Sequence, residues 1–159
     1  MALFGLLQSP TVNDPVCGPL ARSRGYWRGR MALGAHRVIP LLVAGGRDAP
    51  DGPALVQARE LPARYPTLQR EIATALLEHY EPYRQAIEAG EIVDEPIRLD
   101  STDDVWAHVR PVHIIVAPLD GCLTVEIGYM TTWDVEHTLG ARLVDWHLGE
   151  LNGSVRGVW

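Results

Sequence analysis

The stretch from Val112 to Val144 constrains the fold most, because it has the densest β-branched content of the chain. Two segments, 112–117 and 122–129, flank residues 118–121, which read Pro-Leu-Asp-Gly and are typical of a hairpin turn. In the second segment apolar and smaller or polar residues alternate, with Leu123, Val125, Ile127 and Tyr129 on one face and Cys122, Thr124, Glu126 and Gly128 on the other. This alternation predicts a sheet with one packed face and one partly wet face.

Further strands are expected on both sides of this hairpin. Residues 1–45 are predicted to be β-rich, with a short apolar run at 4–7, a strand at 26–31 and another at 36–43. Segments 138–144 and 148–155 complete the set. Pro40 cannot donate a ladder hydrogen bond, so its N side should lie at a sheet edge or bulge.

The middle of the chain predicts helices. Asp51 is a suitable N-cap and Pro53 suits a first turn, so a helix should begin there and stop near Pro62. A second helix should follow from about Pro66, with apolar residues on one face, and Pro82 should kink or break it. The residues of that face are Leu68, Ile72, Leu76, Tyr80, Tyr83 and Ile87.

A third, short helix is expected from Ser101, because Asp104 follows at the spacing of a capping box. Together these patterns predict an α+β fold, in which an antiparallel sheet packs against two or three helices. The sheet would consist of an N-terminal β-meander and C-terminal hairpins. We expect one domain over 1–159, with a β-rich part at 1–45, a helical part at 51–90, and a short helix followed by β-structure at 101–159.

The charge balance limits the classes of partner. Fourteen basic and twenty acidic residues give a net charge of −6. This argues against general binding to nucleic acid or anionic membranes, which needs a basic face. The first ten residues lack the pattern of a signal peptide, and no run is long and apolar enough for a membrane span. A cytoplasmic location is therefore expected.

The two cysteines, Cys17 and Cys122, form no Cys-x-x-Cys pair and are too few for a disulfide scaffold. We interpret both as buried, reduced thiols.

The main candidate for chemistry is the segment Trp133-Asp134-Val135-Glu136-His137. Its acidic and imidazole groups are metal ligands and acid–base groups. In an extended chain His137 would point away from Asp134 and Glu136, so a shared site requires a bend. The structural alternative is that Asp134 caps a turn while Glu136 and His137 occupy a rim or pair with a neighbouring residue.

Other chemical signatures are weak. The six histidines lack His-x-x-x-His or His-x-His spacing, and no Gly-x-Ser-x-Gly nucleophile motif is present. Gly45-Gly46 is not followed by Lys-Ser or Lys-Thr, as a phosphate loop requires. The basic and aromatic residues at 24–30 could suggest single-stranded nucleic acid, but a β-hairpin fits better in an acidic chain. Trp133, Trp146 and Trp159 occupy turn-like or terminal positions that favour interfaces.

The sequence resembles a bacterial domain family of unknown function over nearly its whole length. The resemblance is carried by Trp27-x-Gly29, Glu78-His79-Tyr80 with Tyr83, and Val105-Trp106-x-His108. It is carried also by 132–140, which read Thr-Trp-Asp-Val-Glu-His-Thr-Leu-Gly, and by the Glu-Leu-Asn-Gly-Ser-Val ending at 150–155. Asp145-Trp146 departs from the tight Asp-Gly turn expected there, and suggests a different loop or a contact surface. The resemblance implies no activity, cofactor or catalytic residue.

Three functional interpretations follow. The first is a non-enzymatic, cytoplasmic protein-interaction domain, with immunity-type proteins as a fold-level analogy. Its binding residues would be Trp133, Asp134, Glu136, His137 and Trp146, with no cofactor and no metal. The second is a metal-binding protein or hydrolase-type enzyme that uses Asp134, Glu136 and His137, with His113 as a further candidate. The third is a structural homo-oligomer.

Overall fold

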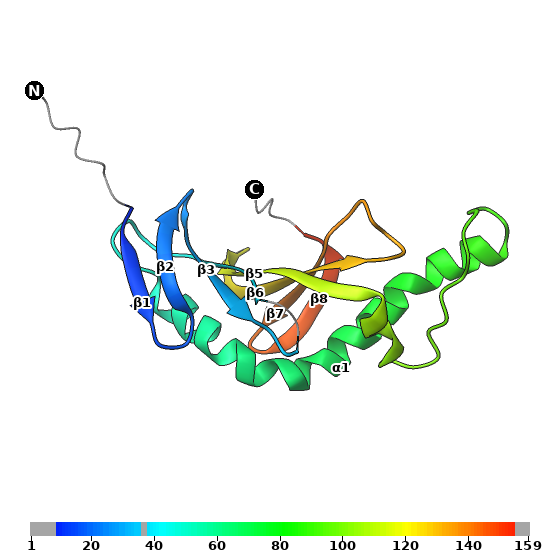
Figure 1. Ribbon diagram of the computed structural model, residues 1–159, viewed down its shortest axis with the longest axis horizontal. Helices are drawn as coiled ribbons and strands as arrows, with labels where there is room; N and C mark the ends of the chain where they lie inside the picture. The colour runs from blue at the N-terminus through cyan, green and yellow to red at the C-terminus, as the bar shows by residue number, and fades with distance from the viewer. Residues whose placement is uncertain (1–8, 36–37, 155–159) are drawn as a thin grey trace, which may run out of the picture.

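The structure of the protein is a computed structural model that describes residues 9–35 and 38–154. Its elements, in chain order, are β1 Thr11–Asp14, β2 Gly18–Ser23, β3 Tyr26–Ala32, β4 Val38–Val43, α1 Gly52–Glu88, the 3₁₀ helix η1 Asp104–Ala107, β5 Val109–Leu119, β6 Cys122–Thr131, β7 Leu139–Val144 and β8 His147–Gly153. One sheet of eight strands lies over a single long α-helix, which runs beneath it as a curved rod (Figure 1).

The strands follow one another in sequence order, from β1 to β8. Neighbouring strands are antiparallel except for β4 and β5, which are parallel, with Leu41 opposite Ile114. The predicted α+β class with helix-on-sheet packing is thus confirmed, but the expectation of a purely antiparallel sheet is wrong. The parallel pair arises because the connection from β4 to β5 is long and helical, and such a crossover returns the chain in the same direction.

The prediction of two or three helices is also wrong, because α1 continues through Pro62, Pro66 and Pro82. Each proline removes an intrahelical hydrogen bond. Pro66 and Pro82 lie on the exposed side, where water can satisfy the freed carbonyl and where a bend follows the sheet surface. The start of the helix is confirmed: Asp51 accepts a hydrogen bond from the Ala54 N–H at 3.1 Å.

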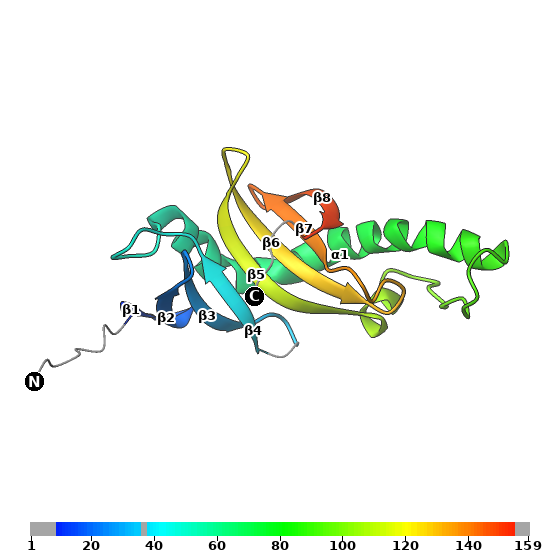
Figure 2. The same cartoon turned by 90° about the horizontal axis from the view of Figure 1, so that it is seen from above.

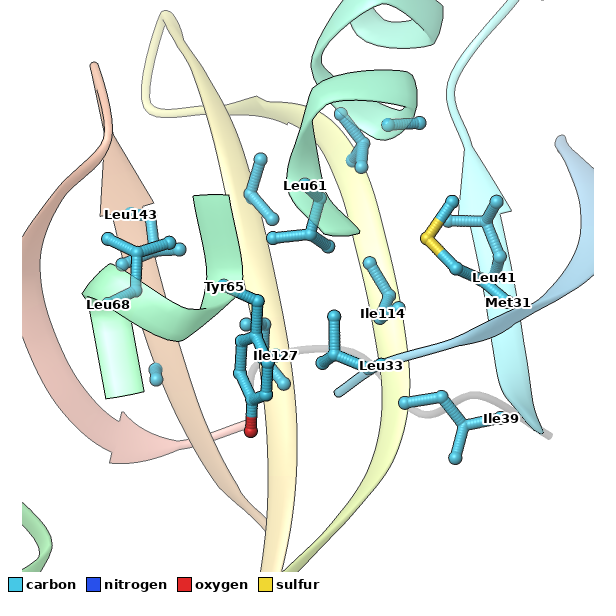
Figure 3. Close-up of a cluster of buried hydrophobic side chains, with 14 of the residues drawn as sticks. Met31, Leu33, Ile39, Leu41, Leu61, Tyr65, Leu68, Ile114, Ile127 and Leu143 are labelled. Atoms are coloured by element: carbon cyan, nitrogen blue, oxygen red, sulfur yellow. The ribbon is translucent and has the colours of Figure 1, made fainter. Parts of the chain in front are cut away.

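Helical periodicity supplies the packing that holds α1 on the sheet. Its buried residues are Ala54, Ala58, Leu61, Tyr65, Leu68, Ile72, Ala73, Leu76 and Tyr80. Figure 3 shows Leu61 and Tyr65 over the long central strands, which carry Ile114 and Ile127, and Leu68 beside Leu143 of β7. Burial of this stripe, which continues to Tyr80, offsets the cost of the prolines, since each buried large apolar side chain contributes roughly 1.5–3 kcal/mol.

The β5–β6 hairpin is confirmed, and its turn places Asp120 and Gly121 at φ 49° and 82°. The apolar face of β6 packs towards α1, as predicted. The opposite face is drier than predicted, because Thr124 and Glu126 are only 5% and 4% exposed. Figure 2 looks down on this second face, with α1 behind the sheet.

The N-terminal strands were predicted only in part. The strand at 26–31 is confirmed as β3, but β1 and β2 were missed because Asn13-Asp14-Pro15 reads as turn chemistry. Pro40 belongs to β4, which is an interior strand and not an edge. The parallel ladder with β5 begins one residue later, at Leu41. The apolar run at 4–7, His36 and Trp159 lie outside the described residues.

The remaining expectations have mixed outcomes. Asp104 accepts a hydrogen bond from the Ser101 N–H, as in one half of a capping box, but the Ser101 hydroxyl donates to the same carboxylate, and only the 3₁₀ turn η1 follows. Cys17 is buried, and its surroundings raise its thiol pKa to about 12, mainly through burial. Cys122 is exposed, contrary to expectation, because its side of the hairpin end is open to solvent. Within the described ranges, no helix has both the length and the apolar character needed to span a membrane.

Candidate functional site

The segment from Thr132 to Thr138 forms a bent loop between β6 and β7. Thr131 holds the bend, because its hydroxyl accepts a hydrogen bond from the Asp134 N–H at 3.1 Å. The bend brings Asp134 and His137 together, with His137 Nδ1 donating to Asp134 Oδ1 at 2.8 Å. The sequence left this convergence open, since an extended chain would have separated the two side chains.

Two hydrogen bonds fix this loop to the C-terminal third of α1. The Tyr83 hydroxyl donates to Asp134 Oδ2 at 3.0 Å. The Trp133 indole N–H donates to His79 Nδ1 at 3.1 Å. Trp133 also packs on Tyr80, with ring centroids 5.2 Å apart and planes tilted by 52°. Tyr80 and Tyr83, which help to position the loop, belong to the helical face that the sequence predicted only as core, whereas His79 was not assigned to that face.

A cavity of about 740 Å³ opens between this loop, α1 and the connection that follows α1. We name it the loop cavity. The C-terminal part of α1, which supplies Tyr80, Tyr83 and Ile87 to the lining of this cavity, projects beyond the sheet (Figure 1). Its lining residues are Tyr80, Tyr83, Ile87, Ile92, Asp94, Glu95, Ile97, His108, Thr132, Trp133, Asp134, Val135, Glu136 and His137. Four of the five predicted binding residues, all except Trp146, thus line one cavity.

The charge states of the loop cavity follow from these contacts. Burial opposes ionisation of Asp134, but the hydrogen bonds from His137 and Tyr83 outweigh it and lower the pKa of the carboxyl. The hydrogen bond to Asp134 raises the pKa of His137. Burial lowers the pKa of His79, which favours the neutral ring that accepts from Trp133. Asp134 is therefore a firm negative charge in the wall of the cavity.

Metal binding finds no geometric support in residues 9–35 and 38–154, where no three His, Cys, Asp or Glu side chains gather to hold an ion. Asp134 is already engaged with Tyr83 and His137. His113, the further candidate, lies on β5, where it contacts Glu126 of β6, and it does not line the loop cavity.

Trp146 lies elsewhere on the molecule. With Asp145 it forms the two-residue turn between β7 and β8, and both residues have positive φ, 63° and 49°. The tight turn is thus kept although neither residue is glycine. The Trp146 ring packs on the core, and the Arg64 guanidinium lies 5.1 Å from its centroid. Arg64 is about 20 Å along α1 from His79, so Trp146 and Trp133 do not share a site.

A buried polar network on the sheet face opposite α1 was missed. Arg142 Nε donates to Glu126 Oε2 at 3.0 Å, and His113 Nε2 approaches Glu126 Oε1 at 3.3 Å. The Ser154 hydroxyl donates to Glu126 Oε1 at 2.5 Å. Burial opposes ionisation of Glu126, but hydrogen bonds from its three partners lower its pKa. Arg142 also pairs with Glu150 and donates to the Gly153 carbonyl.

Two glycines form the floor of this network. A Cβ on Gly128 would lie 2.2 Å from the His113 ring, and one on Gly140 would lie 2.7 Å from the Glu126 carboxyl carbon. Glycines within predicted strands are the signal that could have revealed the network, because they mark a close approach. Ser154 and Glu126 both meet His113 at Nε2. A serine–histidine–acid triad needs one partner on each ring nitrogen, whereas here both partners approach the same nitrogen.

The comparisons with known proteins give a family and no activity. Residues 16–154 match the model of a domain of unknown function, DUF6985. No curated protein and no solved structure matches the chain.

Proposed function

The chain belongs to the DUF6985 family of domains of unknown function, and we propose that it is a non-enzymatic, cytoplasmic protein-interaction domain, with an immunity-type protein as the specific form of that role. The loop cavity and its rim are the proposed binding surface. One observation carries the proposal. Large hydrophobic side chains that remain exposed gather around this cavity.

The described residues include six exposed large hydrophobics, and three of them, Ile92, Val93 and Val135, belong to the segments that border the loop cavity. Val93 is fully exposed and Val135 is 68% exposed. Apolar side chains beside aromatic and charged groups are typical of interfaces that bury a partner. The fixed loop favours binding without large rearrangement, because its hydrogen bonds to α1 hold the surface in place.

A photo-cross-linker at Val135 tests the proposal. The chain has no lysine, so amine-directed reagents can reach only its N-terminal amine. We would therefore replace Val135 by p-benzoylphenylalanine and irradiate in lysate of the source cells. The matched control is Val56 on α1, which is 47% exposed and lies far from the cavity.

We expect one protein to be captured at position 135 and not at 56, and then to bind the purified chain in isothermal titration. Val135→Asp should abolish that binding. If the captured partner is a toxin, co-expression of the chain should restore growth, as an immunity role requires. Equal capture at both positions, or none at 135, contradicts the proposal.

A second candidate is a hydrolase, favoured by the Asp134–His137 dyad. An aspartate that holds the imidazole at 2.8 Å is the arrangement that orients a general base. The hydroxyl of Thr132, which also lines the loop cavity, is engaged with His108 at 3.3 Å, so in this role His137 would activate a water molecule. Turnover of a hydrolase substrate panel that is lost in His137→Ala would establish this role and exclude the first one.

A further inference from the structure

We infer that the loop cavity binds the side chain of an arginine presented by the partner, an inference that rests on the proposed interaction role. The first argument is charge. The cavity is lined by four carboxylates, Asp94, Glu95, Asp134 and Glu136, against two histidines and no arginine. A cavity with an excess of one sign of charge concentrates ligands of the opposite sign.

The carboxylates differ in their contacts. Asp94 is exposed and accepts a hydrogen bond from the Glu95 N–H at 2.9 Å. Asp134 is occupied, since it accepts hydrogen bonds from Tyr83 and His137 and its side chain is only 11% exposed. Glu95 and Glu136 are exposed, and neither carboxylate has a hydrogen-bond or ion-pair partner in the described part of the chain. Asp134 therefore positions the loop, and Glu95 and Glu136 remain available to a ligand.

The aromatic side chains select among cations. Tyr83 and Trp133 each use their polar group within the protein, on Asp134 and His79 respectively. Their remaining surfaces in the cavity are apolar. A guanidinium ion is planar and weakly hydrated, so it stacks on aromatic faces while its edge N–H groups meet carboxylates. A lysine ammonium is more strongly hydrated and lacks the flat shape.

The size of the cavity fits this ligand. Small-molecule sites commonly have volumes of roughly 300–1,000 Å³, and the loop cavity has about 740 Å³. That is room for a long side chain and part of the peptide that carries it. The exposed Ile92 and Val135 also line the cavity, where they would contact the apolar stem of the arginine.

The test uses three small probes on the ¹⁵N-labelled full chain: the N-acetyl amides of arginine, lysine and citrulline. Citrulline has nearly the shape of arginine but no charge. We expect arginine to shift the Trp133 indole N–H signal in a saturable way, lysine to bind more weakly, and citrulline to leave that signal unchanged. Equal binding of citrulline and arginine, or no saturable shift with arginine, overturns the inference.

Charge-removing variants distinguish arginine binding at a defined site from a general attraction to the acidic surface. Glu95→Gln and Glu136→Gln should each weaken arginine binding about two- to fivefold, as expected for one exposed charge pair. Asp103→Asn removes the same charge from an exposed residue near this end of the molecule that does not line the cavity. It should change binding much less. An equal effect of all three variants would show that no defined site exists.

The two tests fail separately. If a partner is captured at position 135 but arginine does not bind, the interaction role is supported and the arginine site is contradicted. If arginine binds but no partner is captured, the cation site is supported and the interaction role is contradicted.

Discussion

The Asp14 carboxylate joins the β1–β2 turn to α1. It accepts hydrogen bonds from the Val16 and Cys17 N–H groups and pairs with Arg59 at 2.7 Å. Burial opposes its ionisation, but these contacts outweigh burial and lower its pKa from 3.8 to about 2. The contribution of ionised Asp14 to the stability of the fold is thus fully present above pH 3.8 and is lost as the pH falls towards 2.

We expect Asp14→Asn to lower the free energy of unfolding at pH 7 by about 1–2 kcal/mol, because Arg59 is partly exposed and water screens the pair. Urea titrations at pH 7 and pH 2 measure this. The difference between wild type and variant should shrink at the lower pH. A difference of the same size at both pH values would contradict the assignment.

Gly128 is required by the ring of His113, which leaves no room for a Cβ. We expect Gly128→Ala to destabilise the protein by about 1–3 kcal/mol through overpacking. Gly153→Ala is the matched control, since nothing lies within 4 Å of a Cβ there. In thermal denaturation, the double variant Gly128→Ala, His113→Ala should lose less stability than the sum of the losses in the two single variants. Strict additivity would mean that the two residues do not meet.

His137 should make arginine binding depend on pH. Its pKa is raised by Asp134, so as the pH falls through that value the ring gains a positive charge that opposes a cation. The other groups that face it are Glu136 on its own loop, Tyr83 on α1, and Asp94, Glu95 and His108 across the cavity. Titrations with N-acetyl-arginine amide should show weaker binding at pH 6 than at pH 8, and His137→Ala should remove most of this difference. If the difference persists in that variant, protonation of His137 is not its cause.

At the scale of elements, α1 shows how packing overrides a local preference. Proline costs about 3 kcal/mol relative to alanine within a helix, and Pro66 is exposed. Pro66→Ala restores a hydrogen-bond donor without loss of packing. We expect it to raise the free energy of unfolding by about 1 kcal/mol or more, measured with urea.

Pro96→Ala is the control for that variant, because Pro96 is exposed in an irregular segment. There the substitution only loosens the unfolded chain, and should be neutral or slightly destabilising. A lower stability of Pro66→Ala would show instead that α1 needs the proline bend to follow the sheet.

The elements that could be predicted are those with local signals. Period-two alternation in 122–129 and the Asp120-Gly121 turn predicted the central hairpin, and Asp51 marked the start of α1. The parallel contact of β4 with β5 could not be predicted, because it depends on where α1 returns the chain. The continuity of α1 through Pro62 depends likewise on long-range packing.

The candidate site was predictable in residue type and not in geometry. The sequence singled out Asp134 and His137, yet their contact depends on a bend that Thr131 holds and on a hydroxyl from Tyr83 on a distant helix. Trp146 was assigned to the same surface because turn-like aromatics look alike in sequence. Trp146 instead packs beside Arg64, in a part of α1 that is distant from the loop cavity, and this contact depends on the three-dimensional fold.

At the scale of the whole molecule, charge is separated along the long axis. All fourteen basic residues are arginines, and the β2–β3 hairpin carries Arg22, Arg24, Arg28 and Arg30. Residues 88–104 carry seven carboxylates against one arginine. Figure 1 places that hairpin and the C-terminal end of α1 towards opposite ends of the molecule. The net charge of −6 therefore hides two regions of opposite sign.

The basic end presents an arginine at its tip. Arg24 is exposed in the β2–β3 turn, with a positive φ of 48° that is uncommon for a residue other than glycine. An exposed arginine side chain is the ligand that we infer for the loop cavity at the other end of the molecule. We therefore expect copies of the chain to associate weakly, head to tail, at low ionic strength. Sedimentation velocity should show an average mass that rises with concentration and returns to that of a monomer at about 0.5 M salt, where screening is strong.

Two charge variants make this prediction strict. Arg24→Gln removes the charge at the tip of the basic end and Glu95→Arg reverses part of the acidic end, so each variant alone should associate much less than the wild type. Each keeps one intact end, and a head-to-tail contact can form once between the two variants but cannot propagate. Their mixture should therefore stop at dimers while the wild type continues to grow. A wild type that stays monomeric at low salt, or a mixture that does not pair, would show that the loop cavity takes its arginine only from another protein.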